Sequence, residues 1–211
     1  MANSIDHFTL GASDLASGTD ALKQTIGVEI PQGGKHPLMS THNGIMATGE
    51  GQFMELIAID PDAPQPDRIR WFSLDEARTI DRLAIRPRAL CWVVNTDDLD
   101  KTVANSPVDL GEIVNMSRGD RTWRLTIPKD GSLPEQGLIP AFIEWSPGPH
   151  PSTVQQDLGI RLNEITLTHP DPAKLQAIFE ALEIDHLATI TEGETALSFD
   201  VNTPNGRVVL D

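Results

Sequence analysis

The chain contains one cysteine among its 211 residues, and this scarcity limits both its cross-links and its metal chemistry. A single thiol, that of Cys91, excludes an internal disulfide and any zinc site built from several thiolates. It is also typical of a reducing compartment, so we expect a cytoplasmic protein. Residues 1–6 lack the basic start of a secretory signal, and no apolar stretch is long enough to cross a bilayer, so we expect no membrane partner.

Basic residues are also scarce. The 16 Lys and Arg residues are outnumbered by 31 Asp and Glu residues, which gives a formal net charge of −15. Such a charge repels phosphate backbones, so we expect no nucleic-acid partner. The sequence likewise lacks a nucleotide-binding glycine loop, a nucleophile elbow and a zinc signature with several histidines. Hydride transfer and serine-type hydrolysis therefore have no support from any motif.

What the chain does contain is a repeated order of predicted elements. Residues 5–10 alternate as a strand, and residues 14–26 place apolar side chains on one helical face before Gly27. Two further strands are predicted over residues 42–48 and 53–59. The same order restarts in the second half, with a strand, a helix and two strands predicted over residues 90–94, 96–103, 122–127 and 139–145.

A third and shorter copy follows, with a strand over residues 162–168 and a helix opened by Asp171-Pro172. Its remaining strands are predicted over residues 196–201 and 207–210. Between the first two copies, Ser73 and Glu76 form a capping-box pattern that predicts a short helix. We therefore divide one compact unit into residues 1–60 (first βαβββ module), 61–87 (connector), 88–150 (second βαβββ module) and 151–211 (partial third module, structural).

Each of the first two copies ends on a glutamate inside an apolar, strand-like run. Glu55 lies in Phe53-Met54-Glu55-Leu56, and Glu144 lies in Phe142-Ile143-Glu144-Trp145. Burying an ionised carboxylate is unfavourable unless it is paired, hydrogen-bonded or bound to a metal. The two positions therefore predict two halves of one site. Superposing the copies pairs Glu55 with Glu144 and His7 with Cys91.

At this point the chain resembles the vicinal oxygen chelate superfamily and, within it, the glyoxalase-like domain family. The motifs that carry the resemblance are Ile5-Asp6-His7-Phe8, Gly33-Gly34-Lys35-His36-Pro37, Thr41-His42-Asn43, Met54-Glu55-Leu56-Ile57-Ala58, Trp123-Arg124-Leu125, Ile143-Glu144-Trp145 and His150-Pro151. The resemblance implies an α+β fold, in which tandem βαβββ modules form curled mixed sheets around a cavity, with a third partial module at the C-terminus. This is the glyoxalase/bleomycin-resistance/dioxygenase-type fold, which hosts many activities.

The resemblance also implies a metal site, because metal-using members hold ligands on the first and last strands of each module. Carried over to this sequence, those positions are His7, Glu55, Cys91 and Glu144. Cys91 departs from the histidine or glutamine that is common at its position, so the fourth ligand stays open. One imidazole and two carboxylates suit Zn²⁺, Mn²⁺, Ni²⁺ or Co²⁺. A ring-cleaving dioxygenase is less favoured, because its iron site needs two histidines.

The implied activity is that of a divalent-metal-dependent lyase or isomerase. Its small substrate carries vicinal oxygens and reacts through a metal-stabilised enediolate, with Glu144 alternating between ligand and catalytic base. The alternative is a non-catalytic protein that binds or sequesters a small molecule, as bleomycin-resistance proteins do. A third alternative is a vestigial pocket in a protein that mainly dimerises. Members of the group often pair through their sheets, so we expect a homodimer.

The predicted substrate contacts are His36, His42, Asn43 and Trp123. His36 and His42 lie in a glycine-proline loop and at a strand entrance, where side chains can project into a cavity mouth. His150 is singled out by the resemblance alone.

Several candidate residues also have a purely structural interpretation. His7 can be a satisfied histidine inside the sheet, and Cys91 can be a small buried apolar residue. Glu144 can pair with Arg118 or Arg124 in place of a metal. By strand alternation Trp145 points opposite Glu144, which favours core or interface packing for its indole.

Overall fold

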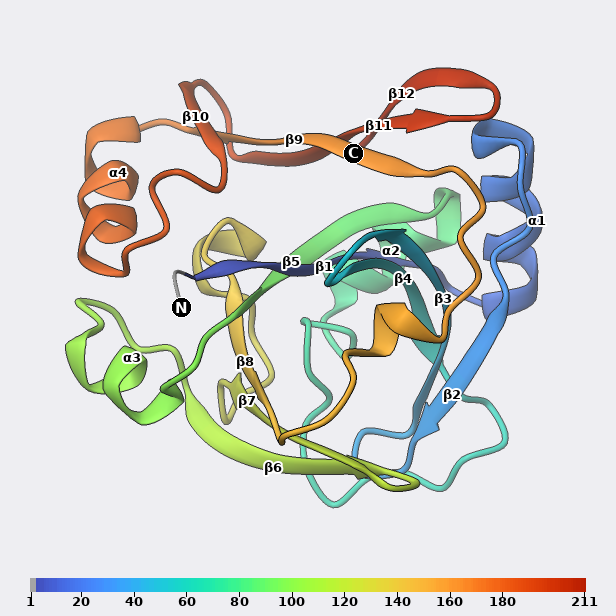
Figure 1. Ribbon diagram of the computed structural model, residues 1–211, viewed down its shortest axis with the longest axis horizontal. Coiled ribbons are helices and arrows are strands. Elements are labelled where there is room, and N and C mark those ends of the chain that lie inside the picture. The colour runs from blue at the N-terminus through green and yellow to red at the C-terminus, as the bar shows by residue number, and fades with distance from the viewer. Residues whose placement is uncertain (1–2) are drawn as a thin grey trace.

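The structure, a computed structural model, describes residues 3–211 as three successive groups of strands and helices (Figure 1). The first group contains β1 (Ser4–Gly11), α1 (Leu15–Ile26), β2 (Gln32–His36), β3 (Thr41–Gly49) and β4 (Gln52–Ile59). The second contains β5 (Arg88–Asn95), α3 (Leu99–Asn105), β6 (Glu112–Arg118), β7 (Arg121–Ile127) and β8 (Ala141–Trp145), with the short helix η1 (Pro134–Gly137) before β8. The third contains β9 (Arg161–His169), α4 (Pro172–Ala181), β10 (Thr189–Glu192), β11 (Ala196–Thr203) and β12 (Gly206–Leu210).

The first two groups form one eight-stranded sheet in the order β2-β3-β4-β1-β5-β8-β7-β6. Figure 1 shows this sheet curling until its two edge strands, β2 and β6, approach each other, and these strands are in contact. The α+β fold of tandem βαβββ modules curled around a cavity is thus the observed architecture.

The pairing of β1 with β5 has an internal two-fold symmetry. Phe8 and Trp92, which lie 84 positions apart, face each other in the antiparallel pair. The flanking pairs are His7 with Val93 and Thr9 with Cys91, so a shift of 84 positions exchanges one pair for the other. His7 and Cys91 are therefore equivalent positions, as the superposition of the two copies predicts.

Local sequence signals explain where most helices begin and end. The Asp14 carboxylate accepts a hydrogen bond from the Ser17 backbone N–H and caps α1, and Gly27 ends this helix with a φ of 80°. The predicted capping box is wrong in position. Helix α2 spans Ala77–Ile85, and Ser73, whose φ is 54°, donates its hydroxyl to Glu76 within the preceding turn.

The third group differs from the predicted partial module. It has all five elements, including β10, but its sheet order is β10-β9-β11-β12. In the first group, β1 pairs in parallel with the last strand, β4, whereas β9 pairs in parallel with the next strand, β10. The third group therefore shares the order of elements with the other two but has a different sheet.

Apolar side chains form two separate cores. The larger core joins the eight-stranded sheet to α1, α4 and the third group, and contains Phe8, Trp92, Phe142, Phe179 and Phe199. The smaller core joins the sheet to the connector between β4 and β5 and contains Trp71, Phe72 and Cys91. None of the helices within residues 3–211 is long and apolar enough to cross a membrane.

Candidate functional site

His7 on β1 and Glu55 on β4 meet inside the curled sheet. The parallel register places Phe53 beside His7 and Glu55 beside Thr9, which brings both side chains to one face. The His7 Nε2 atom lies 3.9 Å from Glu55 Oε2, and both residues are buried. The imidazole is stacked on the Phe53 ring, with a centroid distance of 4.4 Å. The structure thus unites two of the residues predicted to form the site.

A third ionisable group, Asp6, stands behind His7 and was not predicted. Its fully buried carboxylate accepts three hydrogen bonds: from His7 Nδ1 at 2.6 Å, from His150 Nε2 at 3.0 Å and from Trp145 Nε1 at 2.7 Å. Burial alone raises the pKa of Asp6, but the hydrogen bonds and charges of His150 and His7 outweigh it and lower this pKa to about 2. Asp6 is therefore an ionised carboxylate that orients two histidines.

A β-bulge allows Asp6 to reach its neighbour in the sequence. In β5, Val94 pairs with Ile5 and Val93 pairs with His7, so Asp6 is an extra residue without a partner. In a regular strand, adjacent side chains point to opposite faces. The bulge removes that restriction, which is why alternation gives no sign of the contact between Asp6 and His7.

The hydrogen bonds also define the proton positions on the two histidines. The Ser152 backbone N–H donates to His150 Nδ1, so the His150 proton lies on Nε2 and points to Asp6. The His7 Nδ1 proton points to Asp6 as well, which leaves the lone pair of Nε2 facing Glu55. With a neutral His7 ring, two acceptors thus lie 3.9 Å apart in a buried space, and a proton donor can bind His7 Nε2 and the remaining lone pair of Glu55 Oε2.

Glu55 is held in place by neutral donors. Asn43 Nδ2 donates to its Oε1 at 2.6 Å, and the Thr9 hydroxyl donates to its Oε2 at 3.0 Å. The Asn43 amide is itself fixed, because its Oδ1 accepts the Gly34 backbone N–H. The predicted candidate Asn43 therefore faces the cavity, where it positions Glu55.

His36 lies in the same wall and is neutral. Its Nδ1 atom is 3.0 Å from the Thr41 hydroxyl, and its Nε2 atom is 3.5 Å from Asn43 Nδ2. Burial lowers the pKa of His36 to about 4, although the Glu55 charge acts in the opposite direction. The structure therefore places His36 beside the predicted site as an uncharged side chain.

Glu144 lies outside this cavity, contrary to the superposition of the closing strands. Thr9 pairs with Glu55 on β4, whereas Val93, the equivalent of Thr9, pairs with Ala141 on β8. Ala141 therefore occupies the position that corresponds to Glu55. Glu144 is three residues further along, and an odd offset turns a side chain to the other face.

On that other face Glu144 forms an ion pair with Arg124, one of the two partners that the structural interpretation of Glu144 offers. Its carboxylate accepts hydrogen bonds from Arg124, with a shortest distance of 2.8 Å, and from the Leu99 backbone N–H at the start of α3. Arg124 also binds Asp100. Glu144 thus ties α3 to β7 and β8 and does not reach His7.

His42 and Cys91 require similar corrections. His42 alternates with Asn43 on β3, so it faces away from the cavity. Its Nε2 atom is buried and has no hydrogen-bond partner among residues 3–211. Cys91 is fully buried within the smaller core. Burial and then the Glu55 charge raise the pKa of its thiol well above the usual value. Cys91 is therefore a protonated thiol that packs as a small apolar residue.

The cavity around His7 and Glu55 is small and mostly aromatic. Its volume is about 40 Å³, and its aromatic walls are His7, His36, Phe53, Trp71, Phe72, Trp123 and Trp145. Trp123 lines it as predicted, and Trp145 lines it because Glu144 points outward. This volume holds a small terminal group of a ligand, roughly three to four water-sized atoms.

A segment that we call the strap, residues 146–160, covers the cavity between β8 and β9 and includes the short helix η2 (Pro151–Thr153). Three contacts hold it in place: His150 binds Asp6, Ser152 Oγ accepts the Gly51 backbone N–H, and the Gln156 carbonyl accepts the Ala47 N–H. Pro151 lines the cavity itself. The segment was predicted only through the resemblance, at His150-Pro151.

A wider space, the vestibule, adjoins the cavity. Its volume is about 620 Å³, and it is lined by parts of β2, the β6–β7 turn and the strap. Ile45, Arg118 and Pro151 line both spaces, so they mark the passage between them. A ligand that reaches His7 therefore extends from the vestibule.

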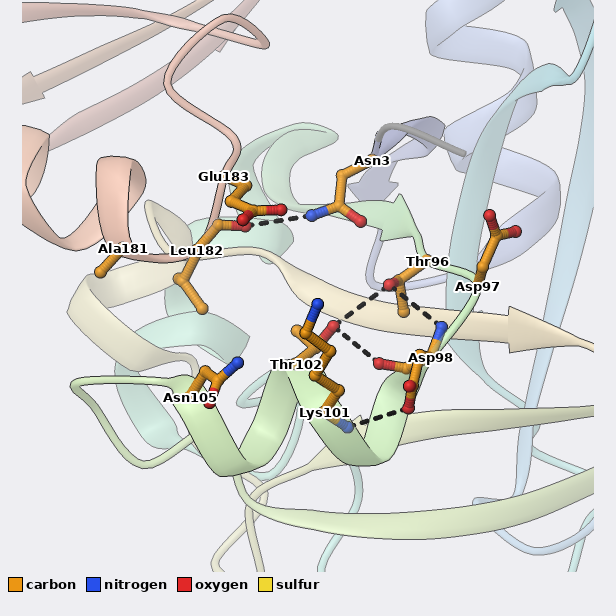
Figure 2. Close-up of a pocket in the computed structure, with 10 residues that line it drawn as sticks. All are labelled: Asn3, Thr96, Asp97, Asp98, Lys101, Thr102, Asn105, Ala181, Leu182 and Glu183. Carbon is orange, nitrogen blue, oxygen red and sulfur yellow. Dashed lines mark hydrogen bonds between the residues drawn. The ribbon is translucent and has the colours of Figure 1, made fainter.

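A third pocket of about 250 Å³ lies between α3 and the end of α4 (Figure 2). Its polar groups largely bind one another: Asn3 donates to the Leu182 carbonyl, Thr96 bonds to Thr102, and Asp98 caps α3. Figure 2 shows Asn3, next to the first strand, joined to Leu182 of the third group, while the other contacts lie within residues 96–102 at the start of α3. We interpret this pocket as a seam between parts of the fold.

The donor set does not fit the divalent ion that the resemblance implies. Of the four equivalent positions, His7 and Glu55 offer ligands, whereas Cys91 is a buried thiol and Ala141 has no donor. Within residues 3–211 no group of three or more His, Cys, Asp and Glu side chains could hold a metal ion. A catalytic zinc site normally has three protein ligands.

Comparisons with known proteins agree with this architecture. Residues 5–183 match a family described as a glyoxalase-like domain. A hypothetical protein from Staphylococcus aureus is similar in structure, with a TM-score of 0.62, 12% sequence identity, and coverage of 99% of this chain and 84% of that chain. No curated protein sequence matches the chain significantly.

Two more distant structures are methylmalonyl-CoA epimerases. The enzyme from Mycobacterium tuberculosis has a TM-score of 0.45 and 16% identity, and the match covers 69% of this chain and 89% of that chain. An epimerase in complex with methylmalonyl-CoA and NH4+ has a TM-score of 0.43 and 15% identity, over 72% of this chain and 100% of that chain.

Proposed function

Because the chain belongs to the glyoxalase-like domain family, we propose that it is a lyase or isomerase that transfers a proton on a small substrate with vicinal oxygens. The observation that carries this proposal is the pair of facing acceptors, His7 Nε2 and Glu55 Oε2, at 3.9 Å in a buried cavity. A substrate group that carries a mobile proton can lie to one side of this pair and contact both atoms. Such a group is an α-hydroxycarbonyl unit.

In the proposed reaction His7 Nε2 removes the proton from the hydroxyl-bearing carbon next to a substrate carbonyl. The electron pair of the broken C–H bond forms the C=C bond of an enediolate, and the carbonyl π pair moves onto the carbonyl oxygen. The imidazolium then returns the proton to the former carbonyl carbon, while the hydroxyl proton moves to the first carbonyl oxygen. Asp6 holds the ring and stabilises the imidazolium as it forms. Glu55 orients the second oxygen-bound proton of the substrate. No step is assigned to a metal, because the donor set does not fit one.

Deuterium exchange tests this proposal without requiring knowledge of the full reaction. In heavy water, the protein is expected to exchange the carbon-bound proton of small α-hydroxycarbonyl compounds such as hydroxyacetone and glyceraldehyde, followed by proton NMR. The His7→Asn variant places an amide near Nδ1, which keeps the donor to Asp6 while Nε2 is lost. We expect exchange to fall by about 10²- to 10⁴-fold.

Glu55→Gln is the second variant, because Asn43 can still donate to the amide oxygen and Thr9 can accept from the amide NH2 group. The matched control is His186→Gln, since His186 is exposed and far from the cavity in the sequence. Exchange that survives in His7→Asn, or that falls equally in His186→Gln, contradicts the assignment. Exchange that is lost on treatment with a chelator and restored by Zn²⁺ or Mn²⁺ contradicts the metal-free assignment.

Binding without turnover is the second candidate function, and the aromatic walls of the cavity favour it. Phe53, Trp71, Trp123 and Trp145 offer flat apolar surfaces that suit an aromatic or heterocyclic ligand. A ligand of this class would quench tryptophan fluorescence on binding. Tight binding in wild type and in His7→Asn, with no exchange in either, would favour sequestration over catalysis.

A further inference from the structure

The turn between β6 and β7 carries two arginines that the fold leaves unneutralised. Arg118 ends β6 and Arg121 begins β7, and the two are direct cross-strand partners. Within residues 3–211 neither guanidinium forms a hydrogen bond or an ion pair. Like charges in this arrangement destabilise a hairpin. Arg124, on the same strand, is instead bound to Glu144 and Asp100.

The absence of a carboxylate partner is notable in a chain with 31 acidic and 16 basic residues. Carboxylates are abundant enough for each arginine to have one. Asp120 lies in the same turn and the Glu55 charge acts on Arg118, but within residues 3–211 neither carboxylate binds a guanidinium directly. A ligand that supplies negative charge at close range therefore offsets the repulsion between the two arginines.

Both arginines line the vestibule, and Arg118 also lines the inner cavity. Gly34 on β2 makes room for Arg118, since a Cβ atom at Gly34 would lie 2.7 Å from Arg118 Cδ. Burial lowers the pKa of Arg118, whereas the Glu55 charge raises it. The guanidinium therefore stands half-buried between the open vestibule and the acceptor pair of His7 and Glu55.

We propose that Arg118 and Arg121 form an anion site, and that the ligand of the cavity carries a carboxylate or phosphate group bound there. This inference deepens the proposed function and rests on it for the position of the reacting end. The volumes agree with such a ligand. Its charged part occupies the vestibule of about 620 Å³, and only a terminal oxygen-bearing group enters the inner cavity of about 40 Å³.

The test is an equilibrium titration that does not depend on turnover. Inorganic phosphate and acetate are added separately at constant ionic strength, balanced with sodium chloride, and binding is followed by calorimetry and tryptophan fluorescence. We expect saturable binding of at least one anion. The Arg118→Gln and Arg121→Gln variants are expected to weaken it by about ten- to a hundredfold. Stronger binding of phosphate indicates a phosphorylated ligand, and stronger binding of acetate indicates a carboxylic acid.

The matched control is Arg78→Gln, which removes the same charge from an exposed arginine on α2. Arg118→Lys keeps the charge and is expected to retain part of the affinity, which guards against loss of binding through misfolding. Equal weakening in Arg78→Gln, or no saturable binding of either anion to wild type, overturns the proposal.

The His7→Asn variant separates this inference from the proposed function. If His7→Asn still binds the anion and the wild type shows no deuterium exchange, the anion site stands and the proposed proton transfer is contradicted. Anion binding that is lost in His7→Asn but kept in Arg118→Gln places the anion at His7 and contradicts the anion site.

Discussion

Replacing Asp6 by asparagine tests the arrangement behind His7 without changing the cavity wall, because Asp6 is fully buried and is not among the residues that line the cavity. The amide has one oxygen and one NH2 group. The oxygen must face Trp145 and His150, since the indole N–H is only a donor and the Ser152 N–H already fixes the His150 tautomer. The NH2 group therefore faces His7 Nδ1.

This orientation moves the proton of His7 from Nδ1 to Nε2. Nitrogen-15 NMR of the imidazoles distinguishes the two tautomers, so the expected change is directly measurable. An Nε2–H group cannot accept a proton, and deuterium exchange by Asp6→Asn is therefore expected to fall as far as in His7→Asn. A variant in which the His7 proton stays on Nδ1 refutes the hydrogen-bond argument.

The same substitution has a calculable effect on stability. The pKa of Asp6 is lowered from 3.8 to about 2 in the folded protein, which corresponds to roughly 2 kcal/mol. Because the folded-state value is the lower one, this stabilisation is present above about pH 4 and is lost as the pH falls through 2. The groups that lower this pKa through hydrogen bonds and charge are His150 and His7, which both face the carboxylate.

Urea unfolding followed by tryptophan fluorescence, repeated between pH 7 and pH 2, measures this contribution. The difference in unfolding free energy between wild type and Asp6→Asn is expected to shrink by about 2 kcal/mol toward the acid end. A difference that is independent of pH contradicts the low pKa. Asp157→Asn is the control for a carboxylate at the surface. The pKa of Asp157 is also lowered to about 2, but Asp157 and its partner Arg161 are exposed, whereas Asp6 is buried.

Two other residues give distinct expectations. The pKa of His36 in the folded protein, about 4, lies below its ordinary value of 6.5, so the unfolded chain binds the proton first as the pH falls. The free energy of unfolding is therefore expected to fall by roughly 3 kcal/mol between pH 6.5 and 4. If urea titrations of His36→Gln show the same fall, His36 is not its source. For Glu144→Gln we expect weaker attachment of α3 and a lower thermal midpoint, with anion binding and deuterium exchange unchanged, because Glu144 binds Arg124 away from the cavity. Loss of exchange in a folded Glu144→Gln protein would restore the catalytic role that its sequence context predicts.

The sequence predicts the duplicated modules well because their strands and helix ends carry local signals. The strand around His7, helix α1 with Asp14 and Gly27 at its ends, and the strand around Glu55 all lie within a residue or two of the prediction. The missed strands, β2, β6 and β10, lie at sheet edges and are rich in polar residues or glycine; β2 includes His36, which the sequence places in a loop. Such strands have no continuous apolar face to reveal them.

The errors in the site have one geometric cause. Strand alternation correctly relates Glu144 to Trp145, and His42 to Asn43, but it does not say which member of each pair faces inward. That choice depends on the register between strands that are far apart in the sequence. The bulge at Asp6 is a second long-range feature, since only the pairing with β5 reveals it.

The asymmetry of the site follows from what covers each half of a symmetric sheet. The connector packs Trp71 and Phe72 into the core that contains Cys91, and Ala141 packs against the same core. A carboxylate at Ala141 would be buried there among apolar groups, at a cost of several kcal/mol in the absence of a partner. Trp71 and Phe72 also line the cavity at His7 and Glu55, but there the strap adds His150, which binds the same carboxylate that holds His7. One half of the duplication therefore became core, and the other kept the charged groups that acid–base chemistry requires.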